Sequence, residues 1–247
     1  MEGSLVVYDV GNTRTKCGYF VEPPPPGEYA APTSRASWPT GELPLHAATT
    51  PSRVVIGSVV PAAVEGLMAS LPRDWPDADV VTPEQFGLTL DVDEPQAVGV
   101  DRVANAAAIF AITGETSMVV DAGTAATVDA VVLRGGRPTF VGGAILPGLR
   151  LMALSLTERT ARLPAIDPTA ATPELPGRNT RDAIAAGVSV GFRGALMQVV
   201  ARMQQATECT DENVAIEGGD LPTIGEWFPH SRYREGGLTL SGLAMSR

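Results

Sequence analysis

The sequence predicts an α/β fold made of two related halves, each a mixed β-sheet flanked by helices. Short apolar runs typical of buried strands alternate with longer segments typical of helices, and this order occurs twice along the 247 residues. The same polar turn, Asp-x-Gly-x-x-x-Thr, also follows an apolar run twice, beginning at Asp9 and again at Asp121. An internal duplication explains such a matched pair better than chance. We therefore predict two domains of related fold, residues 1–114 and residues 115–247.

The first half is predicted to open with two paired strands, residues 5–8 and 17–21, joined by a polar turn. A proline-rich loop begins at Pro23, and we expect it to continue without regular structure to about Ser52. Two further strands and two helices are predicted beyond it, namely strands at 53–60 and 78–81 and helices at 62–71 and 102–112. The second of these helices is rich in alanine and begins directly after Asp101.

The second half is predicted to repeat this order with three successive strands, at residues 118–120, at 127–133 and around Phe140. Helices are expected at 147–160 and 181–206, separated by a loop that contains several prolines. A last strand is predicted at residues 214–216, directly before Gly218-Gly219-Asp220.

The composition narrows the class of protein before any motif is considered. The chain carries a formal net charge of −10 and shows no cluster of Lys and Arg, which argues against a nucleic-acid binder and an electrostatic membrane anchor. No uninterrupted apolar run approaches the roughly 20 residues that span a bilayer, and no signal peptide is recognisable. Two cysteines and two histidines give neither a disulfide framework nor a zinc site. These observations predict a cytoplasmic protein without nucleic-acid or membrane partners.

The paired turns have the chemistry of a phosphate-binding site. Glycine lets the backbone approach a ligand closely, and backbone N–H groups and threonine hydroxyls can hold phosphate oxygens. The hydroxyls concerned belong to Thr13, Thr15, Thr124 and Thr127. The aspartate that begins each turn would repel a bare phosphate, so it indicates a bound cation. One such turn alone is more often an ordinary hairpin turn, but a matched pair favours a nucleotide with its metal. Neither G-x-x-x-x-G-K-[ST] nor G-x-G-x-x-G occurs, which excludes P-loop and Rossmann sites.

The duplicated turn resembles the acetate and sugar kinase, heat-shock chaperone and actin superfamily. This resemblance implies two actin-like (ribonuclease H-like) domains with a nucleotide, ATP, in the cleft between them. Six motifs narrow the resemblance to the type III pantothenate kinases and cover nearly the whole chain. They are Asp9-Val10-Gly11-Asn12-Thr13-x-x-Lys16, Pro95-x-x-x-Gly99-x-Asp101-Arg102, Asp121-x-Gly123-Thr124-Ala125-x-Thr127, Gly142-Gly143-Ala144-Ile145-Leu146-Pro147-Gly148-Leu149, Gly177-Arg178-Asn179-Thr180 and Leu238-Thr239-Leu240-x-Gly242-Leu243.

The family resemblance implies ATP-dependent phosphorylation of pantothenate to 4′-phosphopantothenate, the first step of coenzyme A biosynthesis. Two alternatives remain open: a non-catalytic, nucleotide-sensing regulatory module of the same fold, and a kinase for another small hydroxy acid. The presence of both Asp101 and Arg102 favours catalysis over the regulatory module. Substrate selectivity would decide between the two kinases.

The resemblance also assigns roles to individual residues. It implies that Asp101 is the catalytic base, although an aspartate at the start of a helix is also an excellent N-cap and both roles can hold. Substrate contacts are implied for Gly99, Val100, Asp101, Arg102 and Thr180. Contacts to ATP are implied for Asp9, Gly11, Asn12, Thr13, Lys16, Gly123 and Thr124. Asp9 would help to hold magnesium through water, and Asp121 would bind a monovalent cation, potassium or ammonium. Thr180 also stands where a helix N-cap is expected.

Two positions depart from the family's pattern. Val92 stands where the family often has an aromatic residue, which would alter the pantothenate pocket. Glu217 stands where a threonine usually precedes Gly-Gly, and its carboxylate would either weaken nucleotide binding or face solvent. The long predicted helix contains Gly187, Gly191 and Gly194, which each cost roughly 1 kcal/mol relative to alanine. Close packing against another helix or subunit would compensate, in keeping with the homodimers of the family.

Overall fold

The computed structural model describes residues 3–25, 27–42, 50–170, 174–234 and 236–247. The chain forms two compact units, and each is described by itself. The first unit contains the residues up to Met118 together with Asp129–Gly142 and Gly237–Arg247. The second contains Val119–Val128 and Gly143–Gly236.

These units do not follow a single cut between residues 114 and 115. The C-terminal segment belongs to the first unit because its helix, α6 (Leu238–Ala244), packs against helix α2 (Val100–Thr113). Sequence periodicity cannot reveal such a return of the chain to its first half. The predicted domain boundary between residues 114 and 115 therefore stays a prediction.

The first sheet is mixed, as predicted, and has the strand order β3-β2-β1-β4-β5. Its strands are β1 (Leu5–Val10), β2 (Arg14–Phe20), β3 (Ser34–Pro39), β4 (Arg53–Ser58) and β5 (Ala78–Val80). Strand β1 runs antiparallel to β2 and parallel to β4, and all six of its residues are buried. A central strand with both faces covered needs a continuous apolar run, which explains why β1 is so clear in the sequence.

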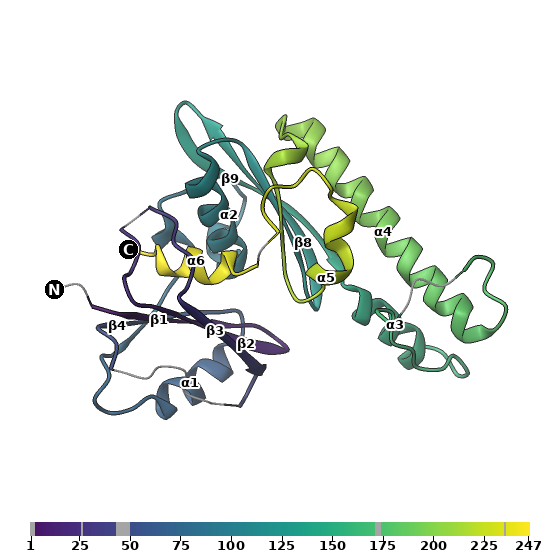
Figure 1. Cartoon of the computed structure of the whole chain (residues 1–247), viewed down its shortest axis with the longest axis horizontal. Coiled ribbons are helices and arrows are strands. Elements are labelled where there is room, and N and C mark those ends of the chain that lie inside the picture. The colour runs from purple at the N-terminus through teal and green to yellow at the C-terminus, as the bar shows by residue number, and fades with distance from the viewer. Residues whose placement is uncertain (1–2, 26, 43–49, 171–173, 235) are drawn as a thin grey trace. The chain divides into compact units, whose positions relative to one another are not determined.

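Helices cover both faces of this sheet (Figure 1). Because successive side chains of a strand point to opposite faces, Leu5 and Val7 pack with α2 and α6 on one face. Val6 and Tyr8 pack on the other face with residues of helix α1 (Pro61–Ser70). Helix α2 therefore packs on the upper face of this sheet in Figure 1, and its N-terminus belongs to the first unit.

The second sheet has the strand order β10-β7-β8-β9-β6. Its strands are β6 (Thr89–Leu90), β7 (Ser117–Ala122), β8 (Ala125–Arg134), β9 (Arg137–Pro147) and β10 (Val214–Glu217). The remaining helices are α3 (Leu149–Glu158), α4 (Thr180–Thr207) and α5 (Leu221–Ile224), and the short 3-10 helices are Pro83–Phe86, Pro95–Ala97, Asp211–Asn213 and Gly225–Trp227. The predicted α/β class with mixed sheets and flanking helices is confirmed.

Some predicted elements are wrong in detail. The loop expected up to Ser52 contains strand β3, whose antiparallel pairing with β2 gives it a structure that its own polar sequence does not indicate. Strand β9 continues to Pro147, so the helix predicted from that residue begins only at Leu149. Helix α4 begins one residue earlier than predicted, at Thr180. Residues 26, 43–49 and 171–173, in the two predicted loops, lie outside the described residues.

Helix α4 also corrects the expectation that no segment is long and apolar enough to span a membrane. Among the described residues it is the one helix that passes this test by length and composition, and 33% of its apolar window is buried. Three glycines, Ser189 and Arg193 interrupt the apolar run, so a search for uninterrupted apolar stretches does not find it. A core helix passes the same test, so this is weak support for a membrane span.

Candidate functional site

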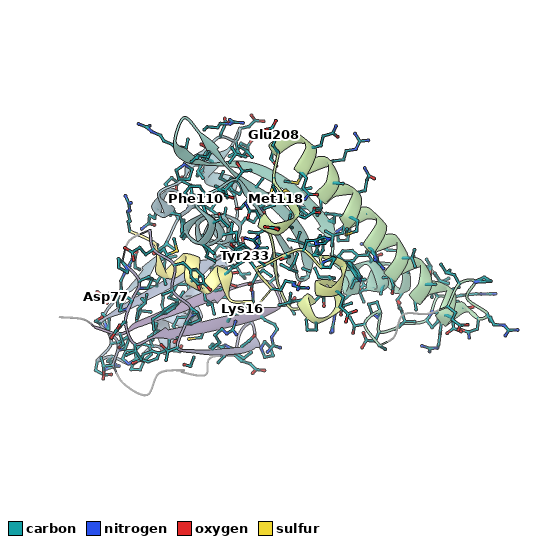
Figure 2. The ribbon with its side chains drawn as sticks, turned by 45° about the horizontal axis from the view of Figure 1, so that its top comes forward. Lys16, Asp77, Phe110, Met118, Glu208 and Tyr233 are labelled. Atoms are coloured by element: carbon teal, nitrogen blue, oxygen red, sulfur yellow. The ribbon has the colours of Figure 1, made fainter. Side chains whose placement is uncertain are left out.

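The first Asp-x-Gly-x-x-x-Thr turn is a β-hairpin connection in the first unit. Asp9 lies near the end of β1 and is directly opposite Lys16 on β2 in the antiparallel register. The Lys16 Nζ lies 3.4 Å from Asp9 Oδ2, and the Asp9 side chain is largely buried whereas 30% of the Lys16 side chain is exposed. Figure 2 labels Lys16 on its strand. The only lysine of the chain is therefore held beside a buried carboxylate at the base of the turn.

The tip of this turn is short and presents polar groups to solvent. Its three residues are Gly11, Asn12 and Thr13, and the last two are exposed. The Gly11 N–H donates to Arg14 O at 3.1 Å. A β-carbon at Gly11 would itself lie 3.1 Å from that oxygen, so a larger residue would crowd the turn. The geometry suits backbone and side-chain contacts to an anion at the tip.

Thr40 supports the turn from outside. No sequence pattern indicated this role, because Thr40 follows strand β3, which was not predicted. Its hydroxyl donates to Gly11 O at 2.7 Å, and its N–H donates to Thr13 O at 3.0 Å. Thr15, whose hydroxyl we expected to hold phosphate, is instead buried and lies 3.5 Å from the Thr40 hydroxyl. Thr15 is therefore a supporting residue of the turn.

The N-terminus of α2 brings a carboxylate into the same unit. The N-cap of the helix is Gly99, and no side chain caps it, so the expectation that Asp101 caps its helix is wrong. Asp101 lies in the first turn and accepts a hydrogen bond from the Arg102 N–H at 2.9 Å. A β-carbon at Gly99 would lie 2.5 Å from Asp101 Oδ1, so a larger residue there would displace the Asp101 carboxylate. Val100 points into the apolar core, so it offers a ligand only its backbone.

The surroundings of Asp101 make it a weaker acid than an ordinary aspartate. Burial, first, and then the negative charge of Asp9 raise the pKa of Asp101 to about 6. Asp129 raises this pKa as well, whereas the Arg102 N–H and the charge of Lys16 lower it. The carboxylate is thus ionised at neutral pH and can still accept a proton, which is the property that a general base needs.

Arg102 is held by a residue that we did not predict, Asp129 on β8. The Nε of Arg102 donates to both carboxylate oxygens of Asp129, at 3.0 and 3.1 Å, and Nη2 also donates to Oδ1. Burial opposes the charge of Arg102, but the hydrogen bonds and charge of Asp129 prevail and raise the pKa of Arg102. The guanidinium also lies over the Phe140 ring, 5.9 Å from its centroid. A buried aspartate in a β-strand gave no local signal of this contact.

The second turn links β7 to β8 in the second unit. Asp121 lies in β7, and the connection consists of Gly123 and Thr124. The Gly123 N–H donates to Ala125 O at 3.1 Å, which closes a tight turn. The exposed Thr124 is a candidate phosphate contact, as predicted. Among the described residues, no three His, Cys, Asp or Glu side chains gather as a metal site, so a cation at Asp121 would depend on backbone oxygens too.

Two glycine motifs pack directly on this second turn. A β-carbon at Gly148 would lie 2.2 Å from Gly123 O, and one at Gly218 would lie 2.3 Å from Ala122 O. The Asp220 N–H donates to Ala122 O at 2.9 Å. These close backbone contacts explain why the segments Pro147-Gly148 and Gly218-Gly219 accompany the turn in the sequence. Glu217, directly before Gly218, is buried, so the expectation that it faces solvent is wrong.

Thr180 lies at the exposed first turn of α4, beside a cavity of about 570 Å³ in the second unit. Asn179, not Thr180, is the N-cap, because its side chain accepts a hydrogen bond from the Asp182 N–H at 3.0 Å. The cavity lies between α3 and α4 and is mainly apolar, and it is lined by Pro147, Met152, Ser155, Leu156, Leu163, Thr180, Ala183, Ile184, Gly187 and Val188. Since capping is done by its neighbour, the Thr180 hydroxyl is not needed for that purpose.

Val92 lies in the first unit against the start of the glycine motif. A β-carbon at Gly142, whose φ is +84°, would lie 3.4 Å from Val92 Cγ1. An aromatic side chain at position 92 would therefore meet this segment of β9. The structure thus places the departure from the family's pattern beside the Gly142-Gly143 motif.

Comparison with known proteins was made with this geometry in hand. The family model described as type III pantothenate kinase matches residues 5–202. A type III pantothenate kinase from Alkalilimnicola ehrlichii is 37% identical over 97% of this chain and 96% of its own length. One from Akkermansia muciniphila is 33% identical over 98% of each chain.

Among solved structures, a Baf family protein from Campylobacter jejuni, described as a transcriptional activator, has a TM-score of 0.60 and 19% identity. The match covers 96% of this chain and 94% of that one. At this identity the likeness shows a shared fold alone. The two mixed sheets flanked by helices agree with the predicted α/β class.

Proposed function

The chain belongs to the type III pantothenate kinase family, and on that premise we propose that Asp101 is the base that receives the proton of the pantothenate hydroxyl. Family membership establishes the overall reaction, ATP-dependent phosphorylation of pantothenate to 4′-phosphopantothenate, the first step of coenzyme A biosynthesis. The observation that carries the proposal is the environment of Asp101, whose burial and anionic neighbours raise its pKa to about 6.

The chemical role of Asp101 follows from the nature of phosphoryl transfer. The transition state is loose, so a catalyst gains most by holding the attacking hydroxyl in line and by accepting its proton late. A carboxylate that is ionised at pH 7 and has an elevated pKa suits both tasks. Its orientation is fixed by the Arg102 N–H, which occupies one of the two carboxylate oxygens.

We propose that the tip of the first turn binds the phosphates of ATP. Asn12 and Thr13 offer backbone and side-chain donors, Gly11 lets a ligand approach the backbone closely, and Lys16 supplies a positive charge. Asp9, buried beside Lys16, fits a magnesium ion held through water, because carboxylate oxygen is the ligand that magnesium prefers. Magnesium would neutralise phosphate charge there. In the second unit, Gly123 and Thr124 are proposed as further ATP contacts.

Asp121 is proposed as the ligand of a monovalent cation, potassium or ammonium. Asp121 lies near the end of β7, beside the turn on which Gly148 and Gly218 pack closely. Such close packing brings several backbone carbonyls near one another, and carbonyl oxygens together with one carboxylate suit a large monovalent ion better than a compact divalent one.

The substrate contacts are proposed to come from Gly99, Val100, Asp101 and Arg102, with Thr180 as a further contact. Val100 contributes its backbone because its side chain lies in the core. Arg102 is the residue that fits the pantothenate carboxylate, since a planar guanidinium can form two parallel hydrogen bonds to it. Thr180 is free of the capping role, which Asn179 performs.

The experiment that tests the function is a phosphorylation assay with pantothenate, ATP and magnesium, run with and without potassium. We expect turnover that falls at least about tenfold when sodium replaces potassium, because sodium is too small for a site built on carbonyl oxygens. Ammonium should restore activity. Turnover that is equal in sodium and potassium would contradict the role of Asp121, and a folded protein without turnover would favour the regulatory module.

We further propose that the chain forms a homodimer through α4. Val190 is 49% exposed, and β-carbons added at Gly187, Gly191 and Gly194 would meet nothing within 4 Å. Glycines at this helical spacing form a flat strip, which another helix can approach closely. A second copy of the chain would cover this apolar strip and offset the cost of three glycines in a helix. We also propose that the protein is cytoplasmic and has neither a membrane nor a nucleic acid as a partner. Burial of the apolar strip in a dimer fits this proposal.

Val190→Asp is expected to convert the dimer to a monomer, because a buried charge at the centre of an apolar contact has no partner. Light scattering would give the mass of two chains for the wild type and of one chain for the variant. Val21→Asp is the matched control, since Val21 is 53% exposed in the first unit and lies outside the strip. A dimeric Val190→Asp variant would contradict the proposed interface.

A further inference from the structure

Asp129 is a buried carboxylate that the family reaction does not itself require. Asp129 is only 3% exposed, and its carboxylate accepts hydrogen bonds from Nε and Nη2 of the Arg102 guanidinium. A guanidinium has two edges on which it can bind a carboxylate with two parallel hydrogen bonds. Asp129 occupies the edge formed by Nε and Nη2.

The other edge of Arg102 is left for a ligand. Three N–H groups of Arg102, two on Nη1 and one on Nη2, do not donate to Asp129. Within the described parts of the chain, Nη1 donates no hydrogen bond. The side chain is nevertheless only 17% exposed, so the open edge is directed and not freely rotating in solvent.

An aromatic ring also restricts movement of the Arg102 guanidinium perpendicular to its plane. Phe140, on the neighbouring strand β9, presents its ring 5.9 Å from the guanidinium carbon. Strand β8 thus places the Asp129 carboxylate along one edge of the Arg102 guanidinium, and strand β9 places the Phe140 ring against its face. This arrangement leaves the long, flexible arginine side chain with little rotational freedom to lose when it binds a substrate.

We propose that Asp129 is a positioning residue that makes the enzyme selective for a substrate with a carboxylate, by holding Arg102 so that its Nη1 edge meets that group. The inference rests on the proposed contact between Arg102 and pantothenate. Asp129 touches neither substrate nor ATP in this scheme, and its effect on pantothenate binding passes through Arg102.

A purely structural ion pair between α2 and β8 is the competing interpretation. Both interpretations expect that loss of Asp129 destabilises the fold, because Arg102 would keep a half-buried charge without a partner. Only positioning expects a selective effect on pantothenate binding. The test must therefore separate the KM for pantothenate from the KM for ATP and from stability.

Asp129→Asn keeps the size of the side chain and removes its charge. We expect the KM for pantothenate to rise about tenfold and the KM for ATP to change less than about twofold, because the carboxylate contact depends on the orientation of Arg102. The preference for pantothenate over its neutral primary amide should fall by a similar factor. Thermal unfolding checks that the variant is folded at the assay temperature.

Asp129→Glu is the conservative variant, and it retains the charge while displacing the guanidinium by one methylene. Its KM for pantothenate is expected to rise about threefold, less than in Asp129→Asn. If Asp129→Asn does not fold, this variant decides the matter, and a wild-type KM for pantothenate in it overturns the proposal. A wild-type KM in folded Asp129→Asn overturns it as well.

Arg102→Ala separates this inference from the proposed function. In the Arg102→Ala background, Asp129→Asn should change the KM for pantothenate less than about twofold, since the two residues act as one unit. A full tenfold effect in that background would overturn the proposal. If Arg102→Ala alone leaves the KM unchanged, the proposed carboxylate contact is wrong and this inference falls with it. If Arg102→Ala raises the KM and Asp129→Asn does not, only the positioning role is wrong.

Discussion

Asp101→Asn is expected to lower kcat by at least about 100-fold and, at the same time, to make the folded protein more stable at neutral pH. General-base catalysis contributes on the order of 10² to 10⁴ in rate, and an amide cannot accept the proton of the substrate hydroxyl. The hydrogen bond from the Arg102 N–H to Oδ1 can persist in the variant because an amide oxygen also accepts. Loss of activity without loss of structure is therefore the expected result.

The gain in stability follows from the direction of the pKa shift. The pKa of Asp101 is 3.8 in an ordinary environment and about 6 in the folded protein. Folding is therefore not opposed by Asp101 below pH 3.8, where the group is neutral in both states. As pH rises from about 3.8 to about 6, the unfolded chain releases this proton while the folded protein still holds it, so the free energy of unfolding falls, and above about 6 the full loss is present. Two pKa units correspond to about 3 kcal/mol.

Urea unfolding of the wild type and of Asp101→Asn at pH 5 and pH 8 measures this effect. The variant should be the more stable protein at both values, and its advantage should be larger at pH 8. An advantage that does not grow with pH would contradict the elevated pKa. The kcat/KM of the wild type should also fall below pH 6, because the base must be ionised.

Asp77→Asn is the matched control for Asp101→Asn. It makes the same chemical change in the same unit at an exposed position, which Figure 2 labels. Exposed substitutions of this kind usually change stability by less than about 0.5 kcal/mol. The kcat of this variant should equal that of the wild type.

The sequence could predict the parts of the site whose signals are local. Asp9, Gly11 and Lys16 belong to one hairpin, so a strand–turn–strand pattern is enough to place them together. Asp101 and Arg102 are adjacent at the start of a helix that its alanines make obvious. In such cases secondary structure alone fixes which side chains are neighbours.

The parts that were missed depend on contacts between distant segments. Strand β3 has few apolar residues, and only its pairing with β2 explains its structure and the placement of Thr40. Asp129 looks like an isolated polar residue in an apolar strand until α2 is packed beside it. Similarly, Asn179 caps α4 although Thr180 is also a common N-cap residue, because the cap depends on where the helix begins.

Helix α6 shows how a distant segment can set the geometry of the site. Its Gly242 lies so close to α2 that an added β-carbon would be 2.0 Å from Ala104 O, a backbone atom that cannot rotate away. The Thr239 hydroxyl of α6 donates to Asn105 Oδ1 of α2 at 2.9 Å. Helix α2, which carries Asp101, is thus held in place by close contacts between its backbone and helix α6.

Gly242→Ala is therefore expected to destabilise the fold by about 2–3 kcal/mol and to lower kcat at least about tenfold. The methyl group must push α2 away from α6, and Asp101, one turn before Ala104, must move with its helix. Urea unfolding and steady-state kinetics measure the two effects. Gly66→Ala is the matched control, because Gly66 is exposed within α1 and an added β-carbon meets nothing within 4 Å. That change should stabilise the protein by about 1 kcal/mol and leave kcat unaltered. If both variants keep wild-type kcat, the packing of α6 on α2 does not position Asp101.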